Sequence, residues 1–196
     1  MVNKLLDEYE CPFDIYMFKF INMHLDMYYK LGFTPNMVTT LSIIFGLLAA
    51  YEIIYGNFIF AAFLVLVSYY LDCVDGKLAR KYNMVSQLGD YYDHFGDLFK
   101  YILIIYALIK SNKKTKINER QWFFILILII LTVAQAIHMG YQESLYNNKS
   151  ESSYLNILRK IVSFDKTPEK TIQYTKHMGC GSWNVCFAIL IIFWRN

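Results

Sequence analysis

The sequence has little net charge, few cysteines and no leader-like start, and each of these shortages narrows what the protein can be. The 196 residues carry a formal net charge of only +3, and the basic residues form no stripe, so a nucleic-acid partner is not indicated. The four cysteines form no CxxC pair and no metal-ligand spacing with histidine, so we expect unpaired structural residues. Residues 1–10 are acidic and have no basic region followed by an apolar core, which argues against a cleavable signal peptide.

Hydrophobic residues, in contrast, make up 56% of the chain and gather in long runs. A membrane-spanning helix needs about 20 apolar residues, and the bilayer excludes open sheets because it cannot hydrogen-bond free backbone groups. The sequence therefore predicts an all-α, multi-pass integral membrane protein with about five transmembrane helices. The predicted spans are residues 38–55, 58–78, 87–109, 122–138 and 183–194, the last of which is short unless it begins near residue 176. Trp122 and Trp194, at the ends of spans, are interpreted as interfacial anchors.

The segment before the first span has a different pattern. Apolar residues recur at helical spacing over residues 11–31, with polar residues on the other side, which predicts an amphipathic helix on the membrane surface. A helix packed on a neighbouring part of the protein is the alternative. We accordingly divide the chain into an N-terminal segment, residues 1–37, and a transmembrane domain, residues 38–196. A short helix is expected over residues 154–162.

Four aspartates interrupt the apolar runs. A single carboxylate at the centre of a bilayer costs about 2.5–3.5 kcal/mol. Asp72 and Asp75 are three apart and Asp93 and Asp97 are four apart, so each pair lies on one helix face. Residues 81–88 are few enough to make the two helices antiparallel neighbours, which lets the pairs meet. Four converging carboxylates suit two divalent ions, which can hold the attacking and leaving oxygens of a displacement at phosphorus.

Neighbouring residues suit a phosphate ligand. Arg80 lies between the two pairs, and its guanidinium is shaped for bidentate phosphate contact. Gly76 and Gly89 lack a side chain, so a ligand or another backbone can approach closely. Together these residues predict a pyrophosphate site at a membrane face. The alternative is a set of interhelical salt bridges in which the acidic residues pair with Lys77, Arg80 and Lys81.

The spacing of these residues resembles a known motif. The run reads D-x2-D-G-x2-A-R, then eight residues, then G-x3-D-x3-D, and it resembles the defining motif of the CDP-alcohol phosphotransferases. The matching positions are Asp72, Asp75, Gly76, Ala79, Arg80, Gly89, Asp93 and Asp97. The family is built on a helical membrane core that usually has six helices, one more than the apolar spans counted here.

The resemblance implies roles for individual residues. In the family the motif aspartates hold two divalent ions, which implies Mg²⁺ or Mn²⁺ at Asp72, Asp75, Asp93 and Asp97. The motif glycine and arginine contact the CDP moiety, hence Gly76 and Arg80, and Ser86 falls where some members place a small hydroxyl residue. Residues 34–39 look like the family's P-N-x-x-T element, which points to Asn36 as a nucleotide contact. The alternative for Thr39 is a cap that starts the first helix.

A finer resemblance concerns the subgroup. The sequence D-G-K-L-A-R and the later L-G-D-Y-Y-D-H-F-G-D are similar to the choline and ethanolamine branch, although Asp90 replaces the usual Glu and Phe95-Gly96 replaces Gly-x. In that branch the histidine after the third aspartate is the proposed general base, which implies His94, and imidazole suits the task because its pKa lies near operating pH. In other branches the last aspartate, here Asp97, has that role. An interfacial histidine bonded to a neighbour is the alternative for His94.

The resemblance implies an enzyme of phospholipid synthesis that transfers phosphocholine or phosphoethanolamine from a CDP-alcohol to diacylglycerol and releases CMP. Two alternatives stay open. One is transfer from CDP-diacylglycerol to a small alcohol such as inositol or glycerol phosphate. The other is a catalytically incomplete fragment or a non-enzymatic membrane partner.

Orientation and assembly are two further expectations. The site is expected to face the cytosol, and the endoplasmic reticulum membrane is expected if the cell is eukaryotic. That side would collect more lysine and arginine in total, although the densely basic loop 110–120 would then lie opposite. Homodimers are common in the family, so the resemblance also allows a homodimer here.

Overall fold

The described part of the protein is helical throughout. The computed structural model describes residues 7–111, 117–145, 153–163, 165 and 167–194, and this part contains no strand. The α-helices are α1 Pro12–Lys30, α2 Pro35–Tyr55, α3 Phe58–Lys81, α4 Gln87–Ser111, α5 Glu119–Leu145, α6 Ser153–Ile161, α7 Pro168–Thr175 and α8 Cys180–Phe193. Two single-turn 3₁₀ helices, η1 Asp7–Tyr9 and η2 Lys176–Met178, complete the described elements. The all-α prediction is confirmed, as is the short helix expected near residues 154–162.

Four helical stretches of the described part are long and apolar enough to cross a membrane, which makes this a multi-pass integral membrane protein. They are Pro35–Tyr55, Phe58–Lys81, Glu119–Leu145 and Pro168–Phe193. The last one begins well before residue 183, because α7 and η2 lead directly into α8. The remaining predicted span is α4, which has 25 residues. It is not among these four, since its first half carries several charged side chains.

Local sequence signals determine where α2 begins and where it ends. Thr34 is the N-cap of α2, and its side chain accepts a hydrogen bond from the Met37 backbone nitrogen at 3.3 Å. Pro35 occupies the first turn, where its missing N–H costs nothing. Gly56 ends the helix with a φ of 87°, the left-handed conformation that favours glycine. α2 therefore begins slightly earlier than the predicted span and ends where it was expected to end.

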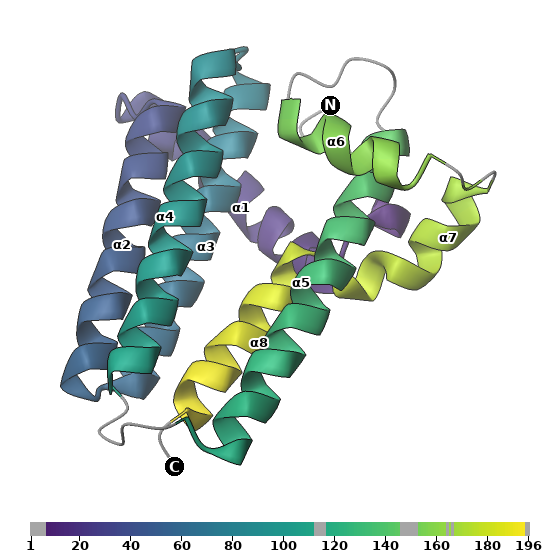
Figure 1. Ribbon diagram of the computed structural model, residues 1–196. Helices are drawn as coiled ribbons and strands as arrows, with labels where there is room; N and C mark the ends of the chain where they lie inside the picture. The colour runs from purple at the N-terminus through teal and green to yellow at the C-terminus, as the bar shows by residue number, and fades with distance from the viewer. Residues whose placement is uncertain (1–6, 112–116, 146–152, 164, 166, 195–196) are drawn as a thin grey trace.

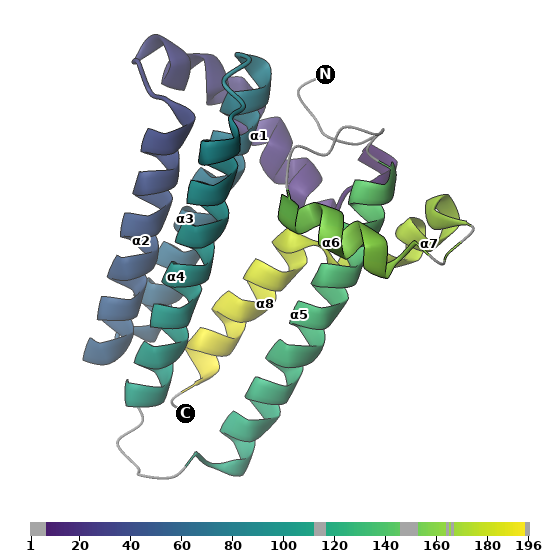
Figure 2. The same ribbon diagram turned by 45° about the horizontal axis from the view of Figure 1, so that its top comes forward.

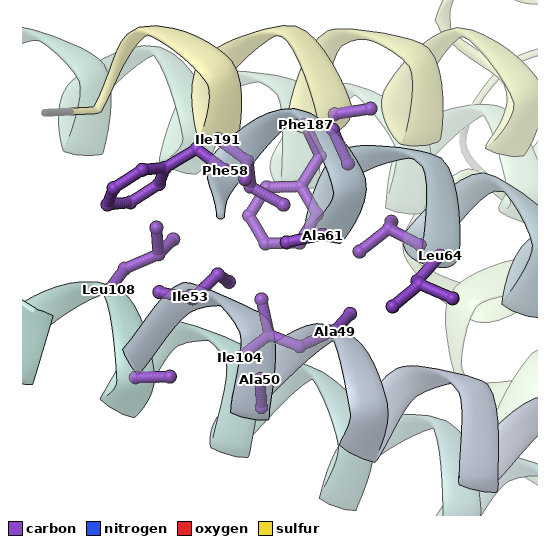
Figure 3. Close-up of a cluster of buried hydrophobic side chains, with 14 of the residues drawn as sticks. Ala49, Ala50, Ile53, Phe58, Ala61, Leu64, Ile104, Leu108, Phe187 and Ile191 are labelled. Atoms are coloured by element: carbon purple, nitrogen blue, oxygen red, sulfur yellow. The ribbon is translucent and has the colours of Figure 1, made fainter. Parts of the chain in front are cut away.

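α2 is the packing partner of both helices that carry the motif. It lies along α3 and along α4, and α8 packs on α3 (Figures 1 and 2). Close approach between α2 and α4 depends on glycine: a Cβ added at Gly96 would meet the Ile43 side chain. Where α3 begins and α4 ends, a large apolar cluster joins these helices to α8 (Figure 3). Its members include Ala49, Ile53, Ala61, Leu64, Ile104, Phe187 and Ile191.

α1 docks on the opposite end of α3. Ile21 and Leu25 are fully buried and share a second apolar cluster with Val74 of α3. Other apolar residues of α1 point away from the protein, and Tyr16 and Met23 are among the most exposed large side chains. The helix predicted over residues 11–31 is therefore confirmed, and one side of it packs on α3. Its position on the membrane surface stays a prediction.

A third group of packed helices is formed by α5, α6 and α7. α6 and α7 pack on the later part of α5, around the buried residues Tyr141, Val162 and Ile172 (Figure 1). Trp122 is exposed, as an anchor requires, but the anchor prediction for Trp194 was wrong. Its indole is buried and donates a 2.8 Å hydrogen bond to the Leu108 carbonyl of α4. All four cysteines are free thiols, as expected.

Candidate metal and nucleotide site

Three of the four motif aspartates converge where the last turns of α3 face the first turns of α4. Asp72, Asp75 and Asp93 each place a carboxylate oxygen within 4.8 Å of the other two. The fourth, Asp97, lies one turn further along α4, and its Oδ1 is 2.5 Å from the Lys100 ammonium. The two pairs therefore meet as predicted: three carboxylates converge directly, and Asp97 joins Asp72 at Lys100, a residue that the sequence did not point to.

The convergent carboxylates suit a divalent cation. They offer hard oxygen ligands of the kind that Mg²⁺ and Mn²⁺ prefer, and three like charges this close repel one another unless a cation neutralises them. Asp93 supplies the clearest sign: its Oδ1 is buried and has no hydrogen-bond partner among the described residues. A buried oxygen without a donor is costly, and an ion at this position would supply the missing partner.

A threonine of α2 holds one of these carboxylates. Thr39 Oγ1 donates a 2.6 Å hydrogen bond to Asp75 Oδ2, and both side chains are buried. The interpretation of Thr39 as a helix cap was wrong, because Thr34 has that role. The sequence signal for this role was present, because Thr39 is the threonine of the P-N-x-x-T element. From that element only Asn36 had been given a role in the site. Thr39 instead fixes the orientation of a candidate metal ligand.

Lys100 is the second residue that the sequence analysis missed. Its side chain is 1% exposed, and Nζ lies 2.8 Å from Ser42 Oγ, 3.3 Å from Asp72 Oδ1 and 2.5 Å from Asp97 Oδ1. A lysine three residues after Asp97, inside an otherwise apolar stretch, was the signal that could have revealed it. The spacing that grouped the aspartates also places this lysine on their face of α4.

The residues expected to contact the CDP moiety gather around the two motif glycines. Ser86 Oγ accepts a 3.0 Å hydrogen bond from the Gly89 backbone nitrogen and so caps α4. A Cβ added at Gly89 would lie 2.9 Å from Ser86 Oγ and 3.2 Å from Asn36 Oδ1. At Gly76 the added atom would lie 3.2 Å from an Arg80 guanidinium nitrogen. At both glycines a side chain would therefore crowd a polar group of a residue expected to contact the CDP moiety.

His94 lies beside the carboxylates. Its Nε2 is 3.4 Å from Asp90 Oδ1, and its Nδ1 is 3.9 Å from Asp93 Oδ2, which is too long for a hydrogen bond. The imidazole is about one-third exposed, since 31% of its side chain remains accessible. The ring is therefore oriented by a neighbour and also adjoins the candidate metal ligands.

One of the three basic residues in the salt-bridge alternative pairs outside the carboxylate cluster. Lys81 pairs with Asp26 of α1, and Tyr82 donates a 2.5 Å hydrogen bond to the same Asp26 oxygen. The hydrogen bonds from Lys81 and Tyr82 hold the pKa of Asp26 below its ordinary value of 3.8. The bond to Asp26 raises the pKa of Tyr82 to about 12. This exposed contact fastens α1 to the end of α3.

Comparison with known proteins settles the family. The model of the CDP-alcohol phosphatidyltransferase family matches residues 33–167, which include every motif position named above. The chain belongs to this family. Its members are transferases of phosphate-containing groups, so the resemblance stated from the motif is confirmed.

Relatives with different activities in their names match parts of this CDP-alcohol phosphatidyltransferase chain. The archaetidylinositol phosphate synthase of Pyrococcus horikoshii is 36% identical over 79 residues, 40% of this chain and 42% of the relative. The CDP-diacylglycerol–serine O-phosphatidyltransferase of Bacillus subtilis is 38% identical over 68 residues, 35% and 38% of the two chains. Human cholinephosphotransferase 1 is 33% identical over 110 residues, 55% of this chain and 26% of the relative. The chain spans less than half the length of each, and no solved structure matches significantly.

Proposed function

We propose that this protein transfers a substituted phosphate group from a CDP-alcohol to an acceptor hydroxyl at the site between α3 and α4. The acceptor oxygen forms a bond to the phosphorus distal to cytidine. The bond from that phosphorus to the bridging oxygen breaks, and CMP leaves with the electron pair. The observation that carries the proposal is the convergence of Asp72, Asp75 and Asp93, with a buried oxygen of Asp93 that lacks a hydrogen-bond donor in the described part.

The residues divide the work of binding. Asp72, Asp75 and Asp93 would hold a divalent ion, Mg²⁺ or Mn²⁺, which when bound neutralises charge on the diphosphate oxygens. Arg80 offers a guanidinium to the same diphosphate. Asn36 and Ser86 lie together beside Gly89 and are proposed to contact the nucleotide.

The proton of the acceptor hydroxyl needs a base, and His94 is the better placed of the two predicted residues. Asp97 already accepts from the Lys100 ammonium. His94 adjoins Asp93, and Asp90 lies near enough to orient its ring. We therefore assign the role of general base to His94. Asp97 remains paired with Lys100 at the edge of the site.

We favour CDP-choline or CDP-ethanolamine as the donor, so that phosphocholine or phosphoethanolamine is transferred, with diacylglycerol as acceptor. The aligned stretch with human cholinephosphotransferase 1 covers more of this chain than either prokaryotic match, and His94 occupies the position of that branch's histidine. Transfer from CDP-diacylglycerol to a small alcohol is the second candidate, favoured by the higher identity of the two prokaryotic relatives. A cytosol-facing site, an endoplasmic reticulum location in a eukaryote and a homodimer remain predictions.

Release of CMP tests the proposal directly. Purified protein in nanodiscs is offered CDP-choline or CDP-ethanolamine with diacylglycerol, and separately CDP-diacylglycerol with serine, inositol, inositol phosphate or glycerol phosphate, with and without Mg²⁺ or Mn²⁺. Asp93→Asn is the inactive variant. Glu52→Gln, at the far end of α2, is the matched carboxylate-to-amide control and keeps full activity. Metal-dependent CMP release with one pair supports the enzyme and names its branch. Folded protein that releases no CMP from any pair would instead favour an incomplete or non-enzymatic chain.

A further inference from the structure

The buried ammonium group of Lys100 is surrounded by hydrogen-bond acceptors of the protein. An ammonium group has three N–H donors, and Nζ of Lys100 has three acceptors within reach. They are Ser42 Oγ at 2.8 Å, Asp97 Oδ1 at 2.5 Å and Asp72 Oδ1 at 3.3 Å. The three acceptors come from α2, α4 and α3, so the ammonium ties together the helices that form the site.

The aliphatic part of the Lys100 side chain is also held in place by packing. α2 leaves room for it at Gly46, where an added Cβ would lie 2.9 Å from Lys100 Cβ. Ser42 is itself fixed: its Oγ donates to the Ser68 carbonyl at 2.9 Å, and Ser68 Oγ donates back to the Ser42 carbonyl at 2.8 Å. All of these side chains are buried. The position of Nζ is therefore determined by packing on two neighbouring helices as well as by attraction to the carboxylates.

We propose that Lys100 supplies, from within the protein, the positive charge that a second divalent ion would otherwise bring, so that each chain binds one such ion. This inference rests on the proposed function, because it concerns the same carboxylates. A second ion would need oxygens of Asp72 and Asp97, and one oxygen of each already faces the ammonium. An ion on those carboxylates would lie only a few ångströms from Nζ, where like charges repel strongly. The remaining ion is the one held by Asp72, Asp75 and Asp93.

In this arrangement Lys100 is a positioning residue. Its three donors are all directed at protein oxygens, so it acts on the substrate only through Asp72 and Asp97. It links a candidate metal ligand on α3 to the last motif aspartate on α4. A merely structural lysine would leave the number of bound ions unchanged when replaced, whereas a lysine that stands in for an ion would not.

The number of bound Mn²⁺ ions per chain tests the inference without any substrate. We would titrate the purified protein, residues 1–196, in detergent with Mn²⁺ and follow the free ion by electron paramagnetic resonance. Wild type is expected to bind one ion per chain, and Lys100→Arg also one, since the charge is kept. Lys100→Met is expected to bind two, with magnetic coupling between them. Lys110→Met, an exposed lysine at the far end of α4, is the matched control and is expected to bind one.

The outcomes separate this inference from the proposed function. Two ions on wild type, or a single ion on both wild type and Lys100→Met, would overturn the role of Lys100 and leave the transferase proposal standing. No Mn²⁺ on wild type at millimolar concentration would remove both. If Lys100→Met does not fold, the ion counts on wild type and Lys100→Arg still decide, because two ions on either would contradict the inference.

Discussion

The two ends of the α2–α3–α4 unit are held together by different interactions. At the end where α3 stops and α4 starts, hydrogen bonds and ion pairs join the helices, through Thr39 to Asp75 and through Lys100 to Asp72 and Asp97. At the other end the contacts are apolar, and Phe187 of α8 completes the cluster (Figure 3). One set of helices thus carries a chemical site at one end and its packing at the other.

The apolar end explains how the charged end is tolerated. Lipid tails are as apolar as leucine, so helices in a bilayer associate chiefly through close packing and hydrogen bonds, and small residues allow that approach. Alanines provide it here, with Ala49 and Ala50 on α2 and Ala61 and Ala62 on α3, all buried in the same cluster. We infer that this cluster holds the helices in register while the carboxylates repel one another. Changes at the two ends should therefore separate activity from stability.

The largest effect is expected from Asp93→Asn. The substitution keeps the size of the side chain but removes a charge from the proposed metal ligands, so CMP release should fall to background. Even partners outside the ligand shell typically cost about 10–100-fold, and a ligand costs more. Mn²⁺ affinity should fall with it, while the thermal unfolding midpoint without metal stays at or above that of wild type, because one repulsive charge is gone. A large drop in that midpoint would show that the two ends are not independent.

Phe187→Ala should have the opposite profile. Phe187 is 1% exposed and packs against Trp183 and Tyr101, with ring centroids 5.0 and 5.9 Å away. Removing a buried aromatic ring costs up to about 3–5 kcal/mol. Thermal unfolding in detergent should show the loss, and Mn²⁺ affinity of the folded fraction should match wild type. Phe193→Ala, an exposed ring on the same helix, is the control and should unfold like wild type.

The parts of the structure that the sequence could predict depend on patterns within one helix or between two consecutive helices. Long apolar runs determine the spans, because every backbone group in a bilayer must bond within its helix. Fixed spacing placed Asp72, Asp75 and Asp93 on facing surfaces, and their convergence in the structure confirms that part of the interpretation. Both inferences depend on periodicity within one or two adjacent helices.

The residues missed by the sequence analysis depend on a third helix. Thr39 reaches Asp75 from α2, and Lys100 is fixed by Ser42 of the same helix. Trp194 is buried because the Leu108 carbonyl at the end of α4 lies within reach of its indole. Helical spacing predicts which residues lie on the same side of one helix. It does not predict which residues of another helix will pack against that side.

A moderate effect is expected from Thr39→Val. The change removes the donor to Asp75 Oδ2 while keeping the shape of the side chain, so one candidate ligand loses its orientation. Loss of such a partner typically lowers metal affinity or activity by about 10–100-fold. Thr40→Val is the matched control, because Thr40 is the next residue and its hydroxyl contacts an exposed tyrosine, Tyr92. If CMP release and Mn²⁺ affinity fell equally in Thr39→Val and Thr40→Val, the effect would come from a disturbed α2 helix and not from the lost hydrogen bond to Asp75.

The smallest effect is expected at Asp26, a polar contact of the charged end that lies in solvent. Hydrogen bonds from Lys81 and Tyr82 lower the pKa of Asp26 below 3.8, so the contact stabilises the folded protein fully above that ordinary value. Its contribution falls as pH drops below 3.8 and is lost once pH passes the lowered pKa. Asp26→Asn should therefore lower the thermal midpoint slightly at pH 7, and the difference from wild type should shrink toward pH 3. A difference that persists unchanged at pH 3 would mean that Asp26 fastens α1 by something other than its charge.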